Sequence, residues 1–247
     1  MIETLDQGLR AELTYTETPK DKLTVIYVPG LGTMGLSTKK ALRARNRLKE
    51  KGYDMNLVTF TYSSHNGNTL SGFENDSKDL GAVVEKLEQR DIPREKIGFF
   101  GVCYGAYVSL QYLAENDDVG FAVMLEPYLG FDSLRAPLQW SAKAAKQASR
   151  LWIPKLPIGR RYGKKWGCID LRSFLASQEQ IPPNRTNTPV IALSTKFHKF
   201  FDLNNIAKFM QDSGHEYFIL KNGRISSEMT HIVYNRISDF LREHFPQ

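Results

Sequence analysis

The chain has 247 residues, of which 41% are hydrophobic and 24% charged, so it is long enough for one sizeable globular domain with a full core. No window approaches the roughly 20 apolar residues of a membrane span, and the N-terminus lacks the basic start and apolar core of a secretory signal. Two cysteines give no disulfide framework. We therefore expect a cytoplasmic protein, in a compartment that keeps thiols reduced.

The net charge of +6 is unevenly placed along the chain. Residues 130–188 hold eleven of the 33 lysines and arginines but three of the 27 acidic residues, so the remainder is slightly acidic. A chain that is basic throughout would indicate a nucleic-acid partner. A nearly neutral chain with one basic segment instead indicates a partner that binds at that segment. We expect no nucleic-acid partner.

Apolar runs alternate with helical patterns along most of the chain. The sequence predicts strands at 9–16, 23–28, 53–62, 97–100, 119–125, 188–193 and 216–220. It predicts helices at 38–51, 73–89, 104–114, 203–213 and 232–244. Strands that alternate with helices indicate an α/β fold, in which a mostly parallel sheet carries helices on both faces.

The stretch after the strand at 97–100 is the most informative one. It reads Gly101-Val102-Cys103-Tyr104-Gly105 and leads directly into a helix. A strand that enters a helix through glycines on both sides of one reactive side chain is the layout of a nucleophile elbow. The turn strains its central residue, and only small residues two positions before and after let strand and helix approach closely. The plain alternative is a buried structural cysteine beside a glycine-rich turn.

The central residue of this turn is Cys103, where a serine is usual. Cysteine is the better intrinsic nucleophile, and a free thiol has a pKa of about 8.5. A helix N-terminus or a histidine partner can lower that pKa. We therefore interpret Cys103 as a nucleophile.

Four anchors together resemble the α/β-hydrolase family, and the resemblance covers nearly the whole chain. They are the Pro29–Gly32 turn, the Gly101–Gly105 elbow, the Pro189–Leu193 strand and the pair Thr230-His231 before the last helix. The resemblance implies an α/β-hydrolase fold with a mostly parallel central sheet flanked by helices. It also implies an acyl-transfer enzyme, an esterase, thioesterase or acyltransferase, that works through an acyl-enzyme intermediate. Similar proteins with cysteine at the elbow include dienelactone hydrolases, polyester synthases and some acyl-CoA acyltransferases and thioesterases.

The resemblance assigns roles to four residues. Cys103 is the nucleophile, and His231, after the last strand, is the general base and then the acid. The backbone N–H groups of Tyr104 and Leu31 form the oxyanion hole, where fixed donors need no reorganisation. The plain alternative for His231 is an exposed loop histidine. Three further histidines lack such a placement and are expected in solvent: His65, His215 and His244.

The catalytic acid is where the sequence departs from the family. His198 stands where the acid is expected. Glu126, which ends a predicted strand, resembles the acid of some lipases of this fold, and a carboxylate there needs a partner. Asp202 is the alternative acid, although helix capping alone explains an aspartate at that position. A Cys103–His231 dyad without an acid is a third interpretation, because a thiolate–imidazolium pair can form in the ground state.

The basic segment falls where the family commonly inserts a lid. We expect residues 1–129 and 188–247 to form the core domain and residues 130–187 to form a basic helical lid. Helical spacing spans 138–152, and a basic run follows at 160–166. A basic rim would suit an acyl ester or thioester on an anionic carrier, such as acyl-CoA or acyl carrier protein, or contact with a membrane surface. The plain alternative is an ordinary cap with a solvated basic face.

Two other classes of function stay open. The chain can be a non-catalytic α/β-hydrolase scaffold that binds a partner or small molecule, for which His198 at the acid position is the best support. It can also be a serine hydrolase that carries a Ser-to-Cys replacement at the elbow. The sequence has no metal-ligand spacing, no dinucleotide-binding fingerprint and no phosphate-binding loop. We therefore expect no metal site and no cofactor.

Overall fold

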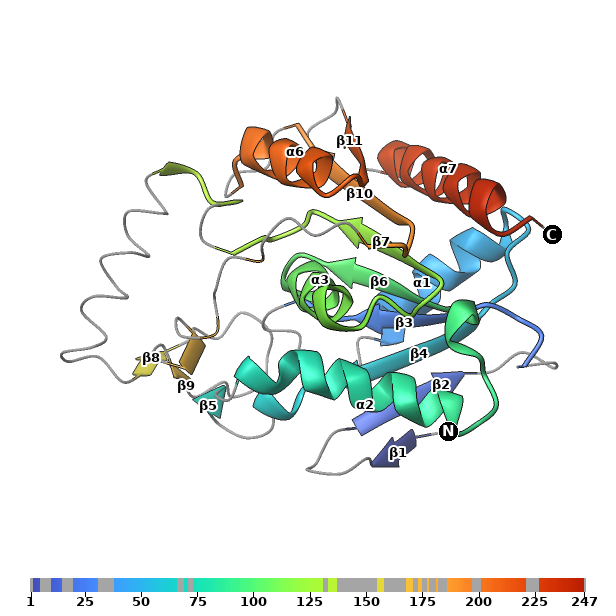
Figure 1. The fold of residues 1–247 in the computed structure, drawn as a ribbon, viewed down its shortest axis with the longest axis horizontal. Helices are drawn as coiled ribbons and strands as arrows, with labels where there is room; N and C mark the ends of the chain where they lie inside the picture. Colours follow the sequence, from blue (N-terminus) through green and yellow to red (C-terminus); the bar gives the residue numbers. More distant parts are fainter. Residues whose placement is uncertain are drawn as a thin grey trace.

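The computed structural model describes residues 2–4, 10–14, 20–30, 38–65, 69–70, 73–130, 133–136, 155–157, 168–170, 173–174, 177, 181, 186–196, 201–220 and 227–246. Among these residues, eight strands form one sheet with helices on both faces (Figure 1). In sheet order the strands are β1 (Ile2–Thr4), β2 (Arg10–Thr14), β4 (Asn56–Thr61), β3 (Thr24–Val28), β6 (Ile97–Val102), β7 (Phe121–Leu125), β10 (Val190–Thr195) and β11 (Glu216–Leu220). The predicted α/β fold with a mostly parallel sheet is confirmed.

The direction of the strands decides where functional groups gather. From β4 to β11 in sheet order, neighbouring strands pair in parallel. β1 and β2 are antiparallel additions at one edge of the sheet. Because parallel strands end at the same edge, the residues that follow β6, β7 and β10 meet there.

Two layers of helices enclose the sheet. The helices are α1 (Thr38–Lys49), α2 (Asp76–Glu88), α3 (Tyr104–Asn116), α6 (Leu203–Asp212) and α7 (Ser227–His244), with short 3-10 turns η2 (Ser63–His65), η3 (Phe73–Asn75) and η4 (Arg94–Lys96). α2, α3 and α6 pack into one core, while α1 and α7 pack into the core on the opposite face (Figure 1). No described helix is long and apolar enough to cross a membrane.

β3 shows why the parallel strands read as continuous apolar runs. All five of its residues are buried. Ile26 and Val28 belong to the core under α2 and α3, whereas Val25 and Tyr27 belong to the core under α1 and α7. A strand covered on both faces has no side that can carry polar residues.

The last helix begins earlier than the sequence predicts. The pattern predicts a helix over 232–244, whereas α7 begins at Ser227. His231 therefore lies within the helix and not on the loop before it, which corrects the expected placement of this residue. The local reason is that Ser227 to Thr230 contains no glycine or proline to delay the helix.

The described parts of the insertion include strands as well as turns. β8 (Lys155–Pro157) and β9 (Cys168–Asp170) pair antiparallel, and β9 pairs in parallel with β5 (Thr69–Leu70). The predicted helix at 138–152 lies outside the described residues. The division into core and lid therefore stays a prediction.

The contact between α3 and the sheet depends on two glycines. A Cβ at Gly101 would lie 2.8 Å from Ala106 Cα, and a Cβ at Gly105 would overlap the Val28 carbonyl oxygen. Both obstacles are backbone atoms, which cannot rotate away as a side chain can. The predicted need for small residues on both sides of Cys103 is confirmed.

Gly105→Ala should therefore lower the free energy of unfolding by about 3 kcal/mol or more, because strand β3 and helix α3 must separate. Gly81→Ala is the matched control, since Gly81 lies inside α2 and its Cβ would meet only the Tyr112 ring, at 3.5 Å. That control should gain about 0.5 to 1 kcal/mol. Denaturant unfolding measures both, and equal effects would contradict the close-approach argument.

Candidate active site

The backbone at Cys103 has the geometry of an elbow. Cys103 follows β6 and precedes α3, with φ 54° and ψ −113°. Positive φ is strained for a residue with a Cβ, so the surroundings must enforce it. The Cys103 N–H donates to the Leu125 carbonyl at 2.9 Å, and its own carbonyl accepts from Ala106 N at 3.0 Å. The side chain is partly exposed and forms no disulfide.

The thiol of Cys103 is harder to ionise than a free cysteine. Burial raises its pKa, the backbone N–H of Tyr104 hydrogen-bonds to it and lowers the pKa, and the carboxylate of Glu126 raises it again. Desolvation is the largest of these effects. The helix N-terminus thus contributes a donor to the thiol. In this arrangement, however, the pKa of Cys103 is raised, whereas the sequence suggests that it is lowered.

Glu126 follows β7 and lies beside the elbow. Its backbone is also strained, with φ 49°. Oε1 accepts from Thr195 N at 3.1 Å and from Thr195 Oγ1 at 2.7 Å, while Oε2 is buried and has no hydrogen-bond partner among the described residues. Burial raises the pKa of Glu126 despite the two bonds from Thr195. Glu126 is therefore anchored through one oxygen and has the other oxygen available for a further partner.

His231 makes its described contacts elsewhere. The ring is exposed on α7, with Nε2 3.4 Å from Lys51 Nζ and Nδ1 3.1 Å from Asn235 Nδ2. Neither of these bonds joins it to Cys103 or Glu126. The described residues thus bring Cys103, Tyr104 and Glu126 together but do not add His231 to them.

The remaining predicted site residues divide into two groups. Leu31, expected to give the second oxyanion donor, and His198, at the family's acid position, lie outside the described residues. Asp202 caps α6, because its Oδ1 accepts from Asn204 N at 3.0 Å and from Asn205 N at 3.4 Å. The carboxylate of Asp202 therefore has the capping role that its sequence position alone explains.

His65 is buried, which corrects the expectation that it lies in solvent. It is 2% exposed, its ring packs against the rings of Tyr62 and Phe73, and neither ring nitrogen has a hydrogen-bond partner in the part of the chain that the structure describes. Burial lowers the pKa of His65 to about 4, so the ring is neutral near neutral pH. The polar residues around it give no sign of burial, although the two rings that cover it, Tyr62 and Phe73, lie on either side of this loop in the sequence.

His215 also departs from that expectation. It is half-buried beside the start of β11, and burial lowers its pKa. His244 is exposed, as expected.

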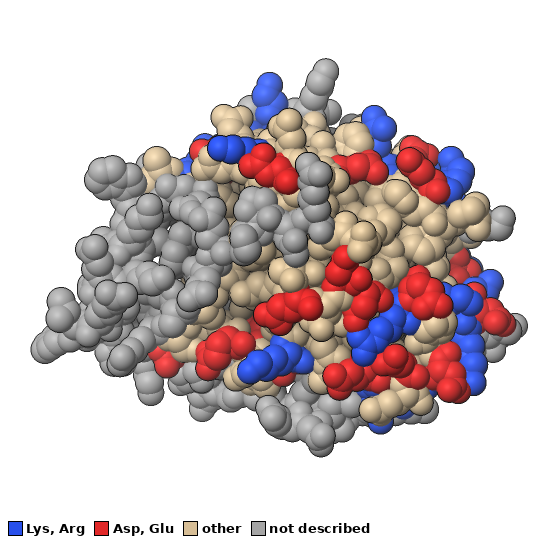
Figure 2. Space-filling model, viewed as in Figure 1, with Lys and Arg blue, Asp and Glu red and all other residues tan. Residues whose placement is uncertain are grey.

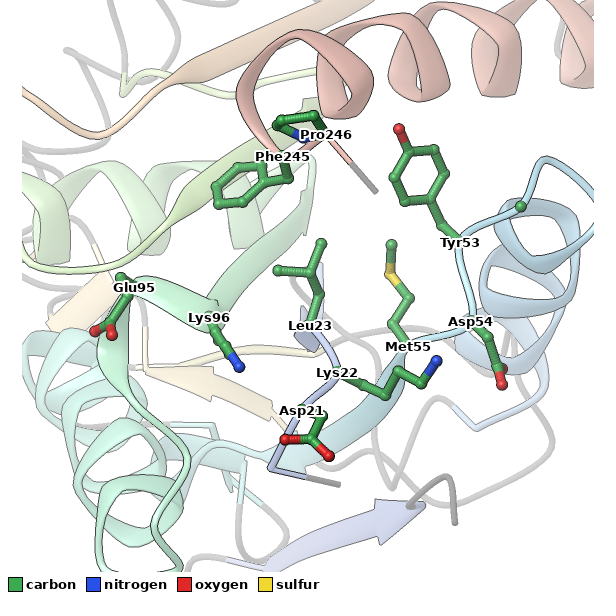
Figure 3. A pocket seen from close by; sticks show the side chains of 11 residues that line it. Asp21, Lys22, Leu23, Tyr53, Asp54, Met55, Glu95, Lys96, Phe245 and Pro246 are labelled. Carbon is green, nitrogen blue, oxygen red and sulfur yellow. The ribbon is translucent and has the colours of Figure 1, made fainter. Parts of the chain in front are cut away.

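A cavity of about 570 Å³ lies at the opposite edge of the sheet (Figure 3). Leu23, Met55 and Lys96 line it, and each directly precedes a strand. Cys103, in contrast, directly follows a strand. Since β3, β4 and β6 are parallel, this cavity is separate from the elbow.

Among the described side chains, one group could share a metal ion. Oxygen and nitrogen atoms of Glu216, Glu243 and His244 lie within 4.8 Å of one another, and all three residues are exposed. Exposed acidic groups of this kind commonly hold no ion, and this group adjoins neither Cys103 nor Glu126 in any described contact.

The described surface carries both signs of charge. Figure 2 shows blue and red side chains interspersed on one face of the molecule. The basic run at 160–166 lies outside the described residues, so its proposed contact with an anionic carrier or a membrane surface stays a prediction.

Replacing Glu126 with glutamine tests its electrostatic effect on the thiol. A carboxylate beside Cys103 disfavours the thiolate, so Glu126→Gln should lower the pKa of Cys103 and speed its alkylation near neutral pH. Iodoacetamide labelling across pH, read by mass spectrometry, measures the midpoint. Asp202→Asn, which alters an exposed cap, should leave the midpoint in place. An unchanged midpoint in Glu126→Gln would contradict a direct effect of the carboxylate on the thiol, and a midpoint that rises would show that Glu126 acts on the thiol through a cationic partner.

Comparison with known proteins supports the fold through structure alone. No protein-family model and no curated protein sequence matches the chain. The chain is similar in structure to a soluble variant of monoglyceride lipase from Saccharomyces cerevisiae, solved with a substrate analogue, at TM-score 0.73 and 14% identity over 100% of this chain and 96% of that one.

Two further solved structures agree. The α/β hydrolase GrgF from a Penicillium species has TM-score 0.71 and 16% identity, covering 100% of this chain and 98% of its own. An esterase of Pyrococcus furiosus has TM-score 0.65 and 16% identity, covering 99% and 91%. With the strand order, the two helix layers and the strained elbow, these likenesses show that the chain has the α/β-hydrolase fold.

Proposed function

We propose that this protein is an acyl-transfer enzyme, acting on an ester or thioester, with Cys103 as its nucleophile. The observation that carries the proposal is the strained backbone of Cys103 at the start of α3, with the Tyr104 N–H directed at the thiol. A structural cysteine needs neither feature. Structural neighbours that are named as a lipase and an esterase support the same class of reaction.

The reaction would proceed in two steps. The thiolate of Cys103 attacks the acyl carbon, and the carbonyl oxygen gains negative charge that the N–H groups of Tyr104 and Leu31 stabilise. The intermediate expels the alcohol or thiol, which takes a proton from the base, and leaves a thioester on Cys103. Water or another acceptor then releases the acyl group through a second oxyanion.

A thioester is the substrate class that suits a cysteine best. Exchange of an acyl group between two sulfur atoms has little thermodynamic cost, whereas with an oxoester the release of the acyl-enzyme becomes the slow step. The basic composition of residues 130–187 favours an anionic carrier such as acyl-CoA or acyl carrier protein.

His231 is the proposed base, with Glu126 as the group that orients it. For this role the ring has to exchange its contacts with Lys51 and Asn235 for Cys103 and the unpartnered Oε2 of Glu126. A buried carboxylate oxygen without a donor is the site at which an imidazole N–H would be most stabilising.

A non-catalytic scaffold is the second candidate. It is favoured by the raised pKa of Cys103 and by the two bonds that hold His231 on the surface of α7. A scaffold needs neither a reactive thiol nor a base.

Turnover of p-nitrophenyl esters and acyl-CoA by the wild type and three variants separates these two candidate functions. Cys103→Ala should lower kcat/KM by about 10⁴-fold, whereas Cys168→Ala should leave it unchanged. If Cys103→Ser turns over faster than the natural cysteine, the chain is a serine hydrolase with a replaced nucleophile. Full activity in Cys103→Ala would contradict the proposal, and no turnover in the wild type would favour the scaffold.

The base is identified by the pH midpoint of Cys103 alkylation. His231→Ala should raise the midpoint and lower kcat, because the thiolate loses its imidazolium partner. His244→Ala, at the exposed end of α7, serves as the control. If His198→Ala has the effect and His231→Ala does not, the base lies after β10 and the assignment of His231 is wrong.

A further inference from the structure

A buried hydrogen bond ties the residue after Cys103 to a neighbouring helix. Tyr104 is the first residue of α3 and is 1% exposed. Its hydroxyl donates to Asp76 Oδ2 at 2.9 Å, and Asp76 is the first residue of α2 and is fully buried. One bond between side chains thus joins the N-termini of the two helices.

The Tyr104 ring is also enclosed on several sides. It lies against four other aromatic rings, with centroids 5.8 to 6.3 Å away: Tyr62, Phe73, Tyr107 and Phe174. Ring contacts are tolerant of small slides, whereas a hydrogen bond to a fixed acceptor has a narrow range of distance and angle. The bond to Asp76 therefore sets the position of the ring along its own plane.

Asp76 is an expensive residue to bury for structural reasons alone. Among the described residues, its Oδ1 has no partner at close hydrogen-bond geometry, although the nearby Ser64 hydroxyl interacts with the carboxyl and lowers its pKa by less than burial raises it. The described groups that face it are Ser64, Tyr104, Tyr62, Asp79 and Glu74, none of which is a cation. Desolvation raises the pKa of Asp76 to about 8, so the carboxyl is neutral near neutral pH. An apolar residue would fill this space without an unpartnered oxygen.

We propose that Asp76 is a positioning residue, which holds Tyr104 through its hydroxyl and so fixes the backbone N–H that is directed at Cys103. The inference deepens the proposed function and rests on it, because this N–H matters for catalysis only if Cys103 is acylated. The N–H donor and the anchored side chain both belong to Tyr104 and are joined at its Cα. Fixing the side chain therefore also restricts the position of the N–H. A displacement of about 1 Å in such a donor can lower the rate by about a hundredfold.

Asp79 supplies a matched control on the same helix. It lies one turn after Asp76 and is also buried, but it accepts from Ser63 N at 2.6 Å and from Ser63 Oγ at 2.8 Å. Asp79 therefore fixes η2 and makes no described bond to α3. A general loss of rigidity at the start of α2 would follow from changes at either aspartate.

The test uses Tyr104→Phe, Asp76→Leu, their double variant and Asp76→Asn in the full chain. Tyr104→Phe and Asp76→Leu should each raise the pH midpoint of Cys103 alkylation and lower kcat about tenfold or more with little change in KM. The double variant should be no worse than either single one. Asp76→Asn keeps a neutral acceptor oxygen and should restore the midpoint and kcat to within about twofold, while Asp79→Asn should leave the midpoint unchanged.

The inference is overturned if Tyr104→Phe leaves both midpoint and kcat unchanged, or if Asp76→Asn is as damaging as Asp76→Leu. Tyr104→Phe removes one oxygen atom and decides the matter even where Asp76→Leu fails to fold. Alkylation needs no substrate, so its midpoint tests the positioning role even if the wild type turns over no ester. The failure of this inference and the failure of the proposed function are therefore separate results.

Discussion

The close approach of α3 to β3 is the constraint on which the rest of the site depends. Gly105 lies against the Val28 carbonyl, where a larger residue would meet backbone. Because the helix begins so close to the sheet, the chain can turn from β6 into α3 only through a strained residue. That residue is Cys103, and its N–H and carbonyl are both tied into the neighbouring backbone. Strain, exposure of the thiol and the nearby N–H donor are thus consequences of one packing contact.

Burial, more than the helix dipole, sets the electrostatics around this turn. The pKa values of Cys103, Glu126 and Asp76 are all raised, and desolvation is the largest cause for each. In such a site the protonated, neutral forms of these three side chains are favoured over their charged forms. A positively charged imidazole placed between Cys103 and Glu126 would lower the pKa of both groups and so favour their charged forms. This is the electrostatic reason that the proposed mechanism requires a histidine there.

The sequence predicts the fold well because each signal is local. The five residues of β3 are apolar or small and are buried on both faces, and the glycines around Cys103 mark the elbow without any knowledge of its neighbours. The surroundings of Asp76 are not predictable in this way, since its partner Tyr104 is 28 residues away. The rings that cover His65 are closer in the sequence, at Tyr62 and Phe73, but the polar residues between them hide its burial.

The predicted start of α7 is five residues late because residues 222–230 read as one polar loop, although Ser226, directly before Ser227, is a residue type that commonly caps helices. The contacts of His231 depend on that start.

The most direct test is to look for the acyl-enzyme itself. The protein is mixed with p-nitrophenyl acetate, quenched in acid within milliseconds, digested, and its peptides are examined by mass spectrometry. An acetyl group on Cys103 that appears before steady-state turnover, and is absent in Cys103→Ala, is the result that this account predicts. Turnover without an adduct on Cys103, or an adduct on another residue, would contradict it.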